Sequence, residues 1–227
     1  MKDVPTIIVA GGKGLRLGRH IPKQYLEVGG KPILHHTLRM LKEAGLRRFI
    51  LVIDLGWKDY LEEQLQDLNL SISYMAGGKE RFDSVMNGLQ ALRGTEEWVL
   101  IHDSVRPLIS PELVGRLLEA AEDPETSCVI PVLPAKDTLK VIRDGKVVRT
   151  LDRKTIVRVG TPQLVRTKDY LEAVEEFKGR MEGITDDASL LERMGRKVTV
   201  VPGEEQGFKI TDEFDLELFQ TIIGRSS

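Results

Sequence analysis

A short apolar run and a glycine cluster meet in the stretch Thr6-Ile-Ile-Val-Ala-Gly-Gly-Lys-Gly-Leu-Arg-Leu-Gly18. The run from 6 to 10 is rich in β-branched residues, which predicts a buried strand. Glycines directly after a strand let the backbone turn tightly and bring its N–H groups close to a ligand. Four basic residues and no acid follow, namely Lys13, Arg16, Arg19 and Lys23. Backbone donors beside positive charge suit a polyphosphate, although an ordinary glycine turn with solvated charges is the alternative.

Two familiar phosphate-binding loops do not match the sequence. The dinucleotide-binding pattern G-x-G-x-x-G, counted from Gly12 and Gly14, needs a glycine where the chain has Leu17. The P-loop pattern ends in G-K-[ST], but the pairs Gly12-Lys13, Gly30-Lys31 and Gly78-Lys79 are not followed by serine or threonine. These mismatches disfavour a nicotinamide-dependent dehydrogenase and a P-loop NTPase.

The composition is that of a globular protein with a proper core. The chain has 227 residues, of which 41% are hydrophobic, and this is enough for one large domain. A net charge of −2 gives no overall attraction to nucleic acid or to an anionic membrane. No apolar run approaches the ~20 residues of a membrane span. The single cysteine, Cys128, excludes an internal disulfide framework and fits a reducing compartment. We therefore expect a cytoplasmic protein without a nucleic-acid or membrane partner.

Strand-like and helix-like segments alternate through the first half of the chain. Strands are predicted at 6–10, 48–53, 71–75, 98–102 and 128–132. Helices are predicted at 32–44, 57–65, 82–92 and 111–121. This alternation predicts an α/β fold with a mostly parallel sheet and helices on both faces. The last third of the chain predicts helices at 167–177 and 186–194, a strand at 198–201, a short strand ending at Ile210 and a final helix capped by Thr211.

The alternation breaks at Pro134. From 136 to 159 charged and β-branched residues alternate, and Asp144-Gly145 is a strong hairpin signal. This pattern predicts a two-stranded arm that is polar on both faces. An isolated hairpin is at best marginally stable, so we expect the arm to pack on a second copy of the chain. Folding back onto its own domain is the alternative. The simplest organisation is one domain over residues 1–227 with the arm at 136–159.

Small and charged residues gather where the predicted strands end, which is where open α/β sheets bind ligands. The third strand leads into Gly77-Gly-Lys-Glu-Arg-Phe-Asp-Ser84, and the fourth into His102-Asp-Ser-Val-Arg-Pro107. A carboxylate just past a buried strand, followed by arginine, suits Mg²⁺ beside an anion clamp. A structural pair of Asp103 and Arg106 is the alternative. The chain has no H-E-x-x-H, C-x-x-C or G-x-S-x-G, so a protein nucleophile is not indicated.

In this order the motifs resemble those of the 2-C-methyl-D-erythritol 4-phosphate cytidylyltransferase family of the non-mevalonate isoprenoid pathway. The resemblance covers nearly the whole chain. It rests on Ala10-Gly-Gly-Lys-Gly-Leu-Arg16, Pro22-Lys-Gln-Tyr25, Gly77–Ser84, His102–Pro107, Asp137-Thr-Leu-Lys140, Asp152-Arg153, Thr161-Pro-Gln163, Thr185-Asp186 and Lys209-Ile-Thr211. It implies a Rossmann-like nucleotidyltransferase fold, a homodimer built through the β-arm, and transfer of CMP from CTP to the sugar-alcohol phosphate with Mg²⁺ and release of pyrophosphate.

The resemblance also implies roles for individual residues. Arg16 and Lys23 stabilise the transition state on the triphosphate side, and Arg153 and Lys209 position the attacking phosphate. The residues that line the acceptor pocket are Asp103, Arg106, Thr138, Thr161 and Thr185, with Thr138 and Arg153 reaching from the arm into the site of the partner subunit. The residues that bind CTP are Ala10, Gly11, Gly12, Gly14, Gly78, Lys79, Arg81 and Ser84. Asp103 is the expected metal ligand.

The chain departs from the family pattern at three places. Family members often carry alanine at Gly11, Ala-Ala at Ser104-Val105, and asparagine at Gly207. The nearest alternative is a ribitol-5-phosphate cytidylyltransferase, whose acceptor differs by a branch methyl and in chain length. The stretch Thr185-Asp-Asp-Ala-Ser189 looks closer to the methylerythritol group. A CTP-binding regulator without turnover is a second alternative, but a sensor would not need the charged set of Arg16, Lys23, Asp103 and Lys209.

Overall fold

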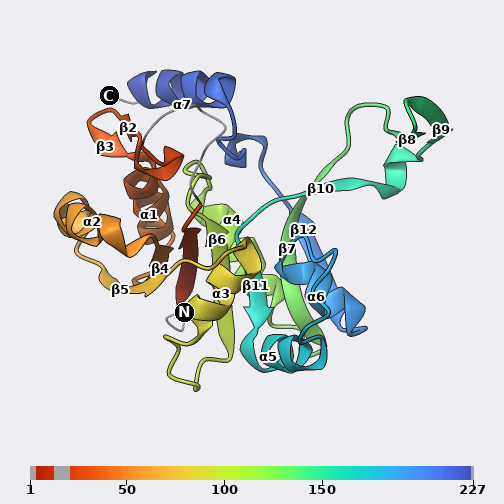
Figure 1. Cartoon of the computed structure of the whole chain (residues 1–227), viewed down its shortest axis with the longest axis horizontal. Coiled ribbons are helices and arrows are strands. Elements are labelled where there is room, and N and C mark those ends of the chain that lie inside the picture. Colours follow the sequence, from red (N-terminus) through yellow and green to blue (C-terminus); the bar gives the residue numbers. More distant parts are fainter. Residues whose placement is uncertain (1–3, 13–20, 226–227) are drawn as a thin grey trace.

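The computed structural model describes residues 4–12 and 21–225, so Lys13, Gly14 and Arg16 lie outside the described residues. Within these limits, one eight-stranded sheet runs through the centre of the molecule (Figure 1). Its order is β10-β7-β11-β6-β1-β4-β5, and β12 pairs with β7. The strands are β1 (Thr6–Ala10), β4 (Arg48–Ile53), β5 (Ser71–Ala76), β6 (Trp98–Asp103), β7 (Thr126–Pro134), β10 (Val157–Val159), β11 (Gln163–Arg166) and β12 (Lys197–Pro202).

Most neighbouring strands of this sheet are parallel. β1 pairs in parallel with β4 and β6, β4 pairs with β5, and β7 pairs with β12. The antiparallel pairs are those of β11 with β6 and β7, and of β10 with β7. The predicted α/β class with a mostly parallel sheet is therefore confirmed. Because β1, β4, β5 and β6 are parallel, their carboxyl ends meet at one edge of the sheet.

Two predictions about short strands are wrong. Residues 163–166 form β11, which lies between β6 and β7, although the sequence analysis placed no strand there. Four residues between a proline and a helix are too few to show a period of two. Conversely, the predicted strand ending at Ile210 is not a strand, because residues 205–207 form a 3₁₀ turn and residues 208–210 pair with no strand in the described chain. This segment is held by a single backbone bond of Ile210, whose N–H donates to the carbonyl of Val105 at 2.9 Å, and in the described chain it forms no ladder.

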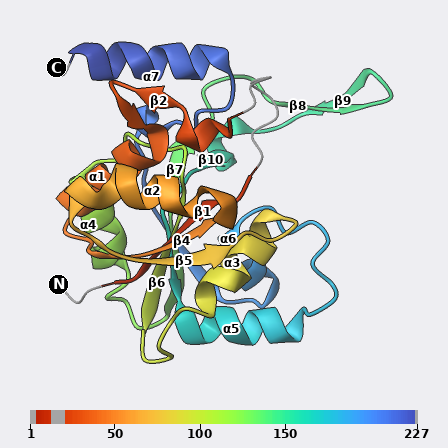
Figure 2. The same cartoon turned by 60° about the vertical axis from the view of Figure 1, so that its left-hand side comes forward.

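Helices cover both faces of the sheet (Figure 2). One face packs against α1 (Ile33–Glu43), α2 (Lys58–Leu65) and α4 (Pro111–Ala120). The other packs against α3 (Arg81–Leu89), α5 (Thr167–Glu176) and α6 (Asp187–Arg193). Ile7 and Ile8 are both fully buried but belong to opposite clusters, because successive side chains of a strand point to opposite faces. Burial on both faces explains why β1 and β4 consist of continuous apolar runs.

The final helix, α7 (Glu213–Arg225), lies across the top of the molecule in Figure 1. Leu216 and Phe219 pack there against Ile33 and Val105. The helix begins later than predicted, and Thr211 is not its cap. The carboxylate of Asp212 accepts the N–H of Asp215, and the carboxylate of Asp215 accepts the N–H groups of Thr211 and Asp212. In the described part of the chain, none of the helices has the length and apolar character needed to cross a bilayer.

The predicted arm projects from the main body as a separate hairpin (Figures 1 and 2). It consists of β8 (Lys140–Arg143) and β9 (Lys146–Thr150), joined by Asp144 and Gly145, both with positive φ as a type I′ turn requires. The chain rejoins the main sheet at β10, so residues 157–159 of the predicted 136–159 belong to that sheet. The arm is not polar on both faces, because Ile142, Val147 and Val148 are more than half exposed.

Two buried histidines, His35 and His36, lie next to each other in α1. Nε2 of His36 donates to the carbonyl of Val28 at 2.8 Å, and its ring meets Phe219 edge-on with centroids 5.3 Å apart. Nε2 of His35 lies 3.0 Å from Asp67. The Nδ1 atoms of both rings are buried and have no hydrogen-bond partner among the described residues. Burial lowers the pKa of both histidines, and their hydrogen bonds oppose this shift only in part.

These histidines should make the fold sensitive to acid. Because their pKa is lower in the folded than in the unfolded chain, the unfolded state binds more protons as the pH falls below about 6.5. Stability is therefore complete above that pH and declines below it. We expect the melting temperature to be lower at pH 5.5 than at pH 7.5, because in this range the unfolded chain takes up more protons than the folded one. Differential scanning calorimetry measures this fall.

His36→Gln is the matched variant, because its amide can still donate to the Val28 carbonyl but cannot take up a proton. We expect its melting temperature to fall less with pH than that of the original chain. Equal falls in both proteins would show that His36 does not contribute to the acid sensitivity.

Candidate active site

A cleft of about 690 Å³ opens at the sheet edge where the carboxyl ends of β1, β5 and β6 meet. The described residues that line it are Val9, Ala10, Gly11, Gly12, Lys23, Gln24, Gly78, Lys79, Glu80, Arg81, Ser84, Asp103, Ser104, Val105 and Lys209. All the described residues that the sequence analysis assigned to CTP line this cleft, together with Lys23, Asp103 and Lys209. The topology of a parallel sheet thus brings together five motifs that are spread along the sequence.

The start of the glycine-rich loop is held in place by Gln24. Its Nε2 donates to the carbonyls of Ala10 and Gly12 at 2.6 and 2.9 Å. Both hydrogens of this buried amide are therefore used to fix the backbone where it enters the cleft. Lys23 is fixed from another side, since its Nζ donates to the carbonyl of Ile210 at 2.9 Å. The sequence analysis quoted Gln24 within a motif but gave it no role.

The loop after β5 packs closely on the first turn of α3. A Cβ atom on Gly78 would lie 2.2 Å from Cβ of Asp83 and 2.9 Å from the backbone nitrogen of Ser84. The N–H of Gly78 donates to Oγ of Ser84, and the same hydroxyl donates to the carbonyl of Glu80. Glu80 and Asp83 form a capping box at this helix start. The hydroxyl of Ser84, a residue that we expected to bind CTP, is therefore hydrogen-bonded within the loop itself.

We predict that Gly78→Ala distorts the cleft and lowers its activity with CTP. The new methyl group would collide with backbone atoms of α3 that cannot move alone, so the loop or the helix start must shift. A misplacement of about 1 Å near reacting groups can lower turnover by about 10²-fold, and we expect kcat/KM for CTP to fall by at least that factor. Gly115→Ala is the matched control, because a Cβ at Gly115 meets nothing within 4 Å and the residue lies in α4. Comparable kcat/KM values for the two variants would contradict the prediction.

Asp103 lies at the centre of a charged cluster at the floor of the cleft. Its Oδ1 lies 3.3 Å from Nε of Arg81, and its Oδ2 lies 3.3 Å from Nε of Arg106 and 3.0 Å from Nζ of Lys209. Burial alone would raise the pKa of Asp103. The nearby Lys209, Arg81 and Arg106 outweigh burial and hold its pKa below the usual range. Asp103 is therefore an anion at all physiological pH values, and it fixes three cations around itself.

A second buried carboxylate, that of Asp187, completes this cluster. Its Oδ2 accepts from Nη2 of Arg81 at 2.7 Å, and its Oδ1 accepts from the hydroxyl of Tyr170 at 3.0 Å. Burial would lower the pKa of Arg81, but Asp187 and Asp103 together raise it. Gln163 supports the same corner, because its Oε1 accepts from the N–H groups of Asp187 and Ala188. The sequence analysis assigned no role to Asp187, Tyr170 or Gln163.

His102 and Thr161 form a buried polar network behind Asp103. The N–H of Asp103 donates to Oγ1 of Thr161, which lies 3.0 Å from Nδ1 of His102. Nε2 of His102 lies 3.1 Å from the carbonyl of Arg106. Burial lowers the pKa of His102 to about 4, so the ring is neutral at neutral pH. A neutral ring that donates from Nε2 to the carbonyl accepts the Thr161 hydroxyl at Nδ1, which fixes the tautomer and the strand end.

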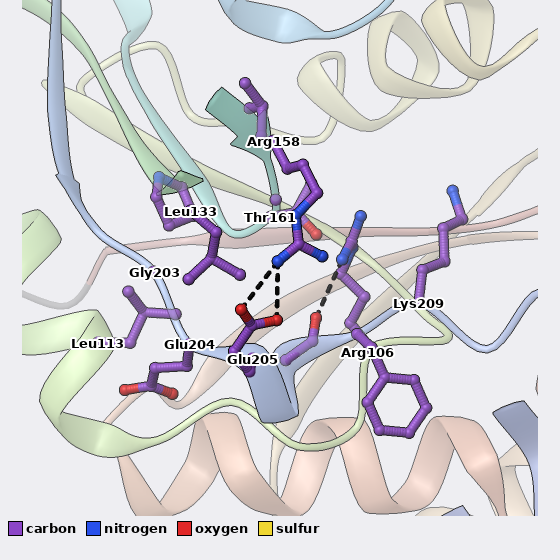
Figure 3. Close-up of a pocket in the computed structure, with 14 residues that line it drawn as sticks. Arg106, Leu113, Leu133, Arg158, Thr161, Gly203, Glu204, Glu205 and Lys209 are labelled. Atoms are coloured by element: carbon purple, nitrogen blue, oxygen red, sulfur yellow. Dashed lines mark hydrogen bonds and ion pairs between the residues drawn. The ribbon is translucent and has the colours of Figure 1, made fainter. Parts of the chain in front are cut away.

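A second, smaller cavity has a volume of about 250 Å³ and contains Arg106 in its wall (Figure 3). Arg106, Thr161 and Lys209 line it, and Lys209 also lines the larger cleft. Arg158 closes part of its rim by pairing with Glu205 at 2.8 Å, as Figure 3 shows. Nη1 of Arg106 donates to the carbonyl of Gly207, so the backbone of residue 207 makes a polar contact without a side chain. The charged cluster thus lies between two cavities.

Three residues expected at the acceptor site lie elsewhere in this subunit. Thr138 and Arg153 are exposed on the arm, where Nη1 of Arg153 donates to the carbonyl of Lys136. Thr185 is exposed before α6, and its N–H donates to Oγ of Ser189. Among the described residues, none of these three lines either cavity. Of the other expected residues, Gly14 and Arg16 lie outside the described part of the chain.

Asp103 was also expected to bind a metal ion. In residues 4–12 and 21–225 no group of three or more histidine, cysteine, aspartate or glutamate side chains could enclose one. A carboxylate has about four acceptor sites, and the three cations use three of them, leaving one on Oδ1. Mg²⁺ often takes only one or two carboxylates and obtains its other ligands from substrate phosphates and water. The donor set therefore fits a metal that arrives with a triphosphate.

Comparison with known proteins gives a consistent result. The family model described as 2-C-methyl-D-erythritol 4-phosphate cytidylyltransferase matches residues 4–225. The chain is 37% identical over 226 residues to the protein of that name from Clostridium botulinum, with 98% of this chain and 100% of the relative covered. It is 38% identical over 221 residues to the one from Bacillus mycoides, with 96% of each covered.

Solved structures agree with these sequence relatives. The crystal structure of 4-diphosphocytidyl-2C-methyl-D-erythritol synthase from Anaerococcus prevotii has a TM-score of 0.85 at 32% identity, covering 98% of this chain and 99% of that one. The 2-C-methyl-D-erythritol 4-phosphate cytidylyltransferase of Thermus thermophilus has a TM-score of 0.78 at 31% identity, covering 97% and 98%. The likeness extends over nearly the whole length of this chain and of both solved structures.

Proposed function

Because the chain belongs to the 2-C-methyl-D-erythritol 4-phosphate cytidylyltransferase family, we infer that it transfers CMP from CTP to 2-C-methyl-D-erythritol 4-phosphate. The products are 4-diphosphocytidyl-2-C-methyl-D-erythritol and pyrophosphate. The observation that carries this inference is the cluster of Asp103, Arg81, Arg106 and Lys209 between two cavities. The larger cavity suits the nucleotide, the smaller one suits the acceptor, and Lys209 lines both.

The chemistry needs positive charge more than it needs a base. The attacking group is a phosphate monoester, whose second pKa of about 6 makes it largely a dianion at neutral pH. One of its oxygens bonds to the α-phosphorus of CTP while the bond from that phosphorus to the β-phosphate oxygen breaks. The bonding electrons leave with pyrophosphate. The barrier arises from bringing two anions together, so fixed cations and correct positioning lower it.

We assign the residues to the two substrates accordingly. Lys23 acts on the triphosphate from the floor of the larger cleft, and Arg16 joins it in the family pattern. Lys209 and Arg106 act on the acceptor phosphate at the junction of the cavities. The carbonyls held by Gln24 and the loop that contains Gly78 and Lys79 surround cytosine and ribose. Thr161 acts through its bonds to His102 and Asp103, and its remaining lone pair is available to an acceptor hydroxyl.

Mg²⁺ is part of this proposal. Asp103 would supply one oxygen ligand through Oδ1, and the bound ion would withdraw charge from the triphosphate. The residues of the chain carry out the rest: Lys23 and Lys209 orient the two anions, and Asp103 keeps Arg81 and Arg106 directed at the site.

We also propose that the enzyme is a single nucleotidyltransferase domain that works as a homodimer through the arm of residues 136–159. The exposed Ile142, Val147 and Val148 support this, because a hairpin with such side chains is expected to pack on another surface. Thr138 and Arg153 would then reach the acceptor pocket of the partner subunit, which fits their distance from both cavities in their own subunit. The buried, reduced Cys128 supports work in the cytoplasm.

Pyrophosphate release tests the proposed function directly. The enzyme is given CTP and Mg²⁺ with either 2-C-methyl-D-erythritol 4-phosphate or ribitol 5-phosphate. We expect release with the first acceptor at a kcat/KM at least about tenfold higher, since a methyl branch is worth about 1–3 kcal/mol in a pocket. Preference for ribitol 5-phosphate would change the acceptor but retain the chemistry. CTP binding without release in either case would refute the assignment in favour of a regulator. The comparisons favour neither alternative.

A further inference from the structure

Asp187 is a buried charge just outside the cleft. It begins α6, and its side chain is only 1% exposed. It does not line either cavity formed by the described residues. Burying a carboxylate is unfavourable unless hydrogen bonds and an opposite charge compensate for the lost water, and here Tyr170 and Arg81 do so. One oxygen of Asp187 therefore binds Arg81, and the other is held by Tyr170.

Arg81 connects Asp187 to the reaction site. Its Nη2 lies 2.7 Å from Asp187, while its Nε lies 3.3 Å from Asp103. A guanidinium carries its donors in a rigid plane, so fixing one end determines the direction of the other. The shorter bond is the one to Asp187, which is anchored in turn by the hydroxyl of the fully buried Tyr170. Asp187 therefore sets the orientation in which Arg81 approaches Asp103.

Asp103 also contacts the two cations at the junction of the cavities, so the position of Arg81 on its carboxylate affects both of them. Arg81 uses one acceptor site of Oδ1, so that both acceptor sites of Oδ2 serve Lys209 and Arg106. If Arg81 lost Asp187, it would have Asp103 as its one remaining carboxylate partner in this cluster. A guanidinium with a single carboxylate prefers to engage both of its oxygens, and it would then compete with Lys209 and Arg106 for Oδ2.

We propose that Asp187 is a positioning residue for the transfer reaction, which holds Arg81 on Oδ1 of Asp103 and thereby keeps Lys209 and Arg106 in place for the acceptor phosphate. This proposal rests on the proposed function of the same site. Asp187 lines neither cavity of the described residues, and it acts through Arg81.

The test is Asp187→Asn, which retains the size of the side chain and its contact with Tyr170 but removes the charge that holds Arg81. We expect kcat to fall by about 10- to 100-fold, because a small misplacement of reacting groups lowers turnover to that extent. Because Arg81 also lines the larger cleft, the affinity for CTP, measured by calorimetry, should fall by a smaller factor than kcat. A second variant, Tyr170→Phe, removes the anchor of Asp187 and should lower kcat in the same direction by a smaller factor.

Asp169→Asn is the matched control. Asp169 is also a buried carboxylate that accepts from a hydroxyl, that of Ser127, and it lies near Arg166 and Arg196. It belongs to α5, the helix that also carries Tyr170, but it does not contact the charged cluster around Asp103. We expect Asp169→Asn to lower the melting temperature while kcat stays within about twofold of the original. A purely structural role of Asp187 would make the two variants alike in both measurements.

A double variant tests whether Asp187 acts through Arg81. If it does, Arg81→Ala combined with Asp187→Asn should have the same kcat/KM as Arg81→Ala alone, because the second change has nothing left to misplace. Independent effects that multiply would overturn the proposal, as would an unchanged kcat in both Asp187→Asn and Tyr170→Phe. The original enzyme is assayed before any variant. If it releases no pyrophosphate with either acceptor, the proposed function itself has failed.

Discussion

Lys23→Ala is expected to lower kcat by about 10²- to 10³-fold while the protein remains folded. Removing one fixed donor from a site that stabilises developing negative charge typically has an effect of this size. Lys23 lines the cleft, and its Nζ is directed there by the bond to the carbonyl of Ile210. The loss should appear mainly in kcat, since negative charge builds up on the leaving pyrophosphate only in the transition state. Steady-state rates of pyrophosphate release at saturating CTP measure it.

Two further variants make this result specific. Lys31→Ala removes a lysine that pairs with Asp67 at 3.2 Å, remote from the cleft, and should leave kcat near its original value. Lys23→Gln retains a donor for the Ile210 carbonyl but lacks the charge, and it should be almost as slow as Lys23→Ala. Near-normal turnover in Lys23→Ala, with CTP still required, would remove Lys23 from the mechanism.

Heterodimers of two inactive variants are expected to regain activity if the arm crosses between subunits. In a dimer of Lys23→Ala with Arg153→Ala, one site combines an intact Lys23 with an intact Arg153 from the partner subunit. The other site lacks both. We therefore expect a purified heterodimer, isolated by two different affinity tags, to have about half of the activity of the original dimer, because a two-fold axis gives two equivalent sites. Each parent homodimer should have about 1% or less of that activity.

The control is a heterodimer of Lys23→Ala with Lys209→Ala. Both lysines line the cleft of the same subunit, so each site of this heterodimer has one defect and should stay inactive. Recovery in the first heterodimer alone would establish that the arm acts in trans. Equal activity in both heterodimers, or recovery in neither, would contradict the proposed crossing of the arm.

Local patterns in the sequence were sufficient to predict most of the fold. The apolar run of β1 and the Asp144-Gly145 turn each depend on neighbouring residues, and the structure has the expected strand and hairpin there. β11 is different, because its four residues carry no recognisable period and are held in place by β6 and β7. The exposed apolar side chains of the arm were also not predicted. The alternation of charged and β-branched residues indicated a hairpin that is polar on both faces.

The support of the site depends on contacts over long distances in the chain. Arg81 and Asp187 are separated by 106 residues, and no local motif joins them. Gln163 and Gln24 were visible in the sequence, but their function of fixing backbone groups appears only when the strands are assembled. Thr138 and Arg153 were assigned to the acceptor site by the resemblance alone, and among the described residues neither lines a cavity in its own subunit.

The pairing of β7 has a consequence for biosynthesis. Among the strands that the structure describes, β7 pairs only with β10, β11 and β12, all of which follow it in the chain. By contrast, β1, β4, β5 and β6 can pair with one another once residue 103 has left the ribosome. During translation of the arm, β7 and one edge of β6 are therefore without partners and prone to associate with other nascent chains. Ribosome-bound chains that stop before residue 163 should accordingly need chaperones more than chains that include it.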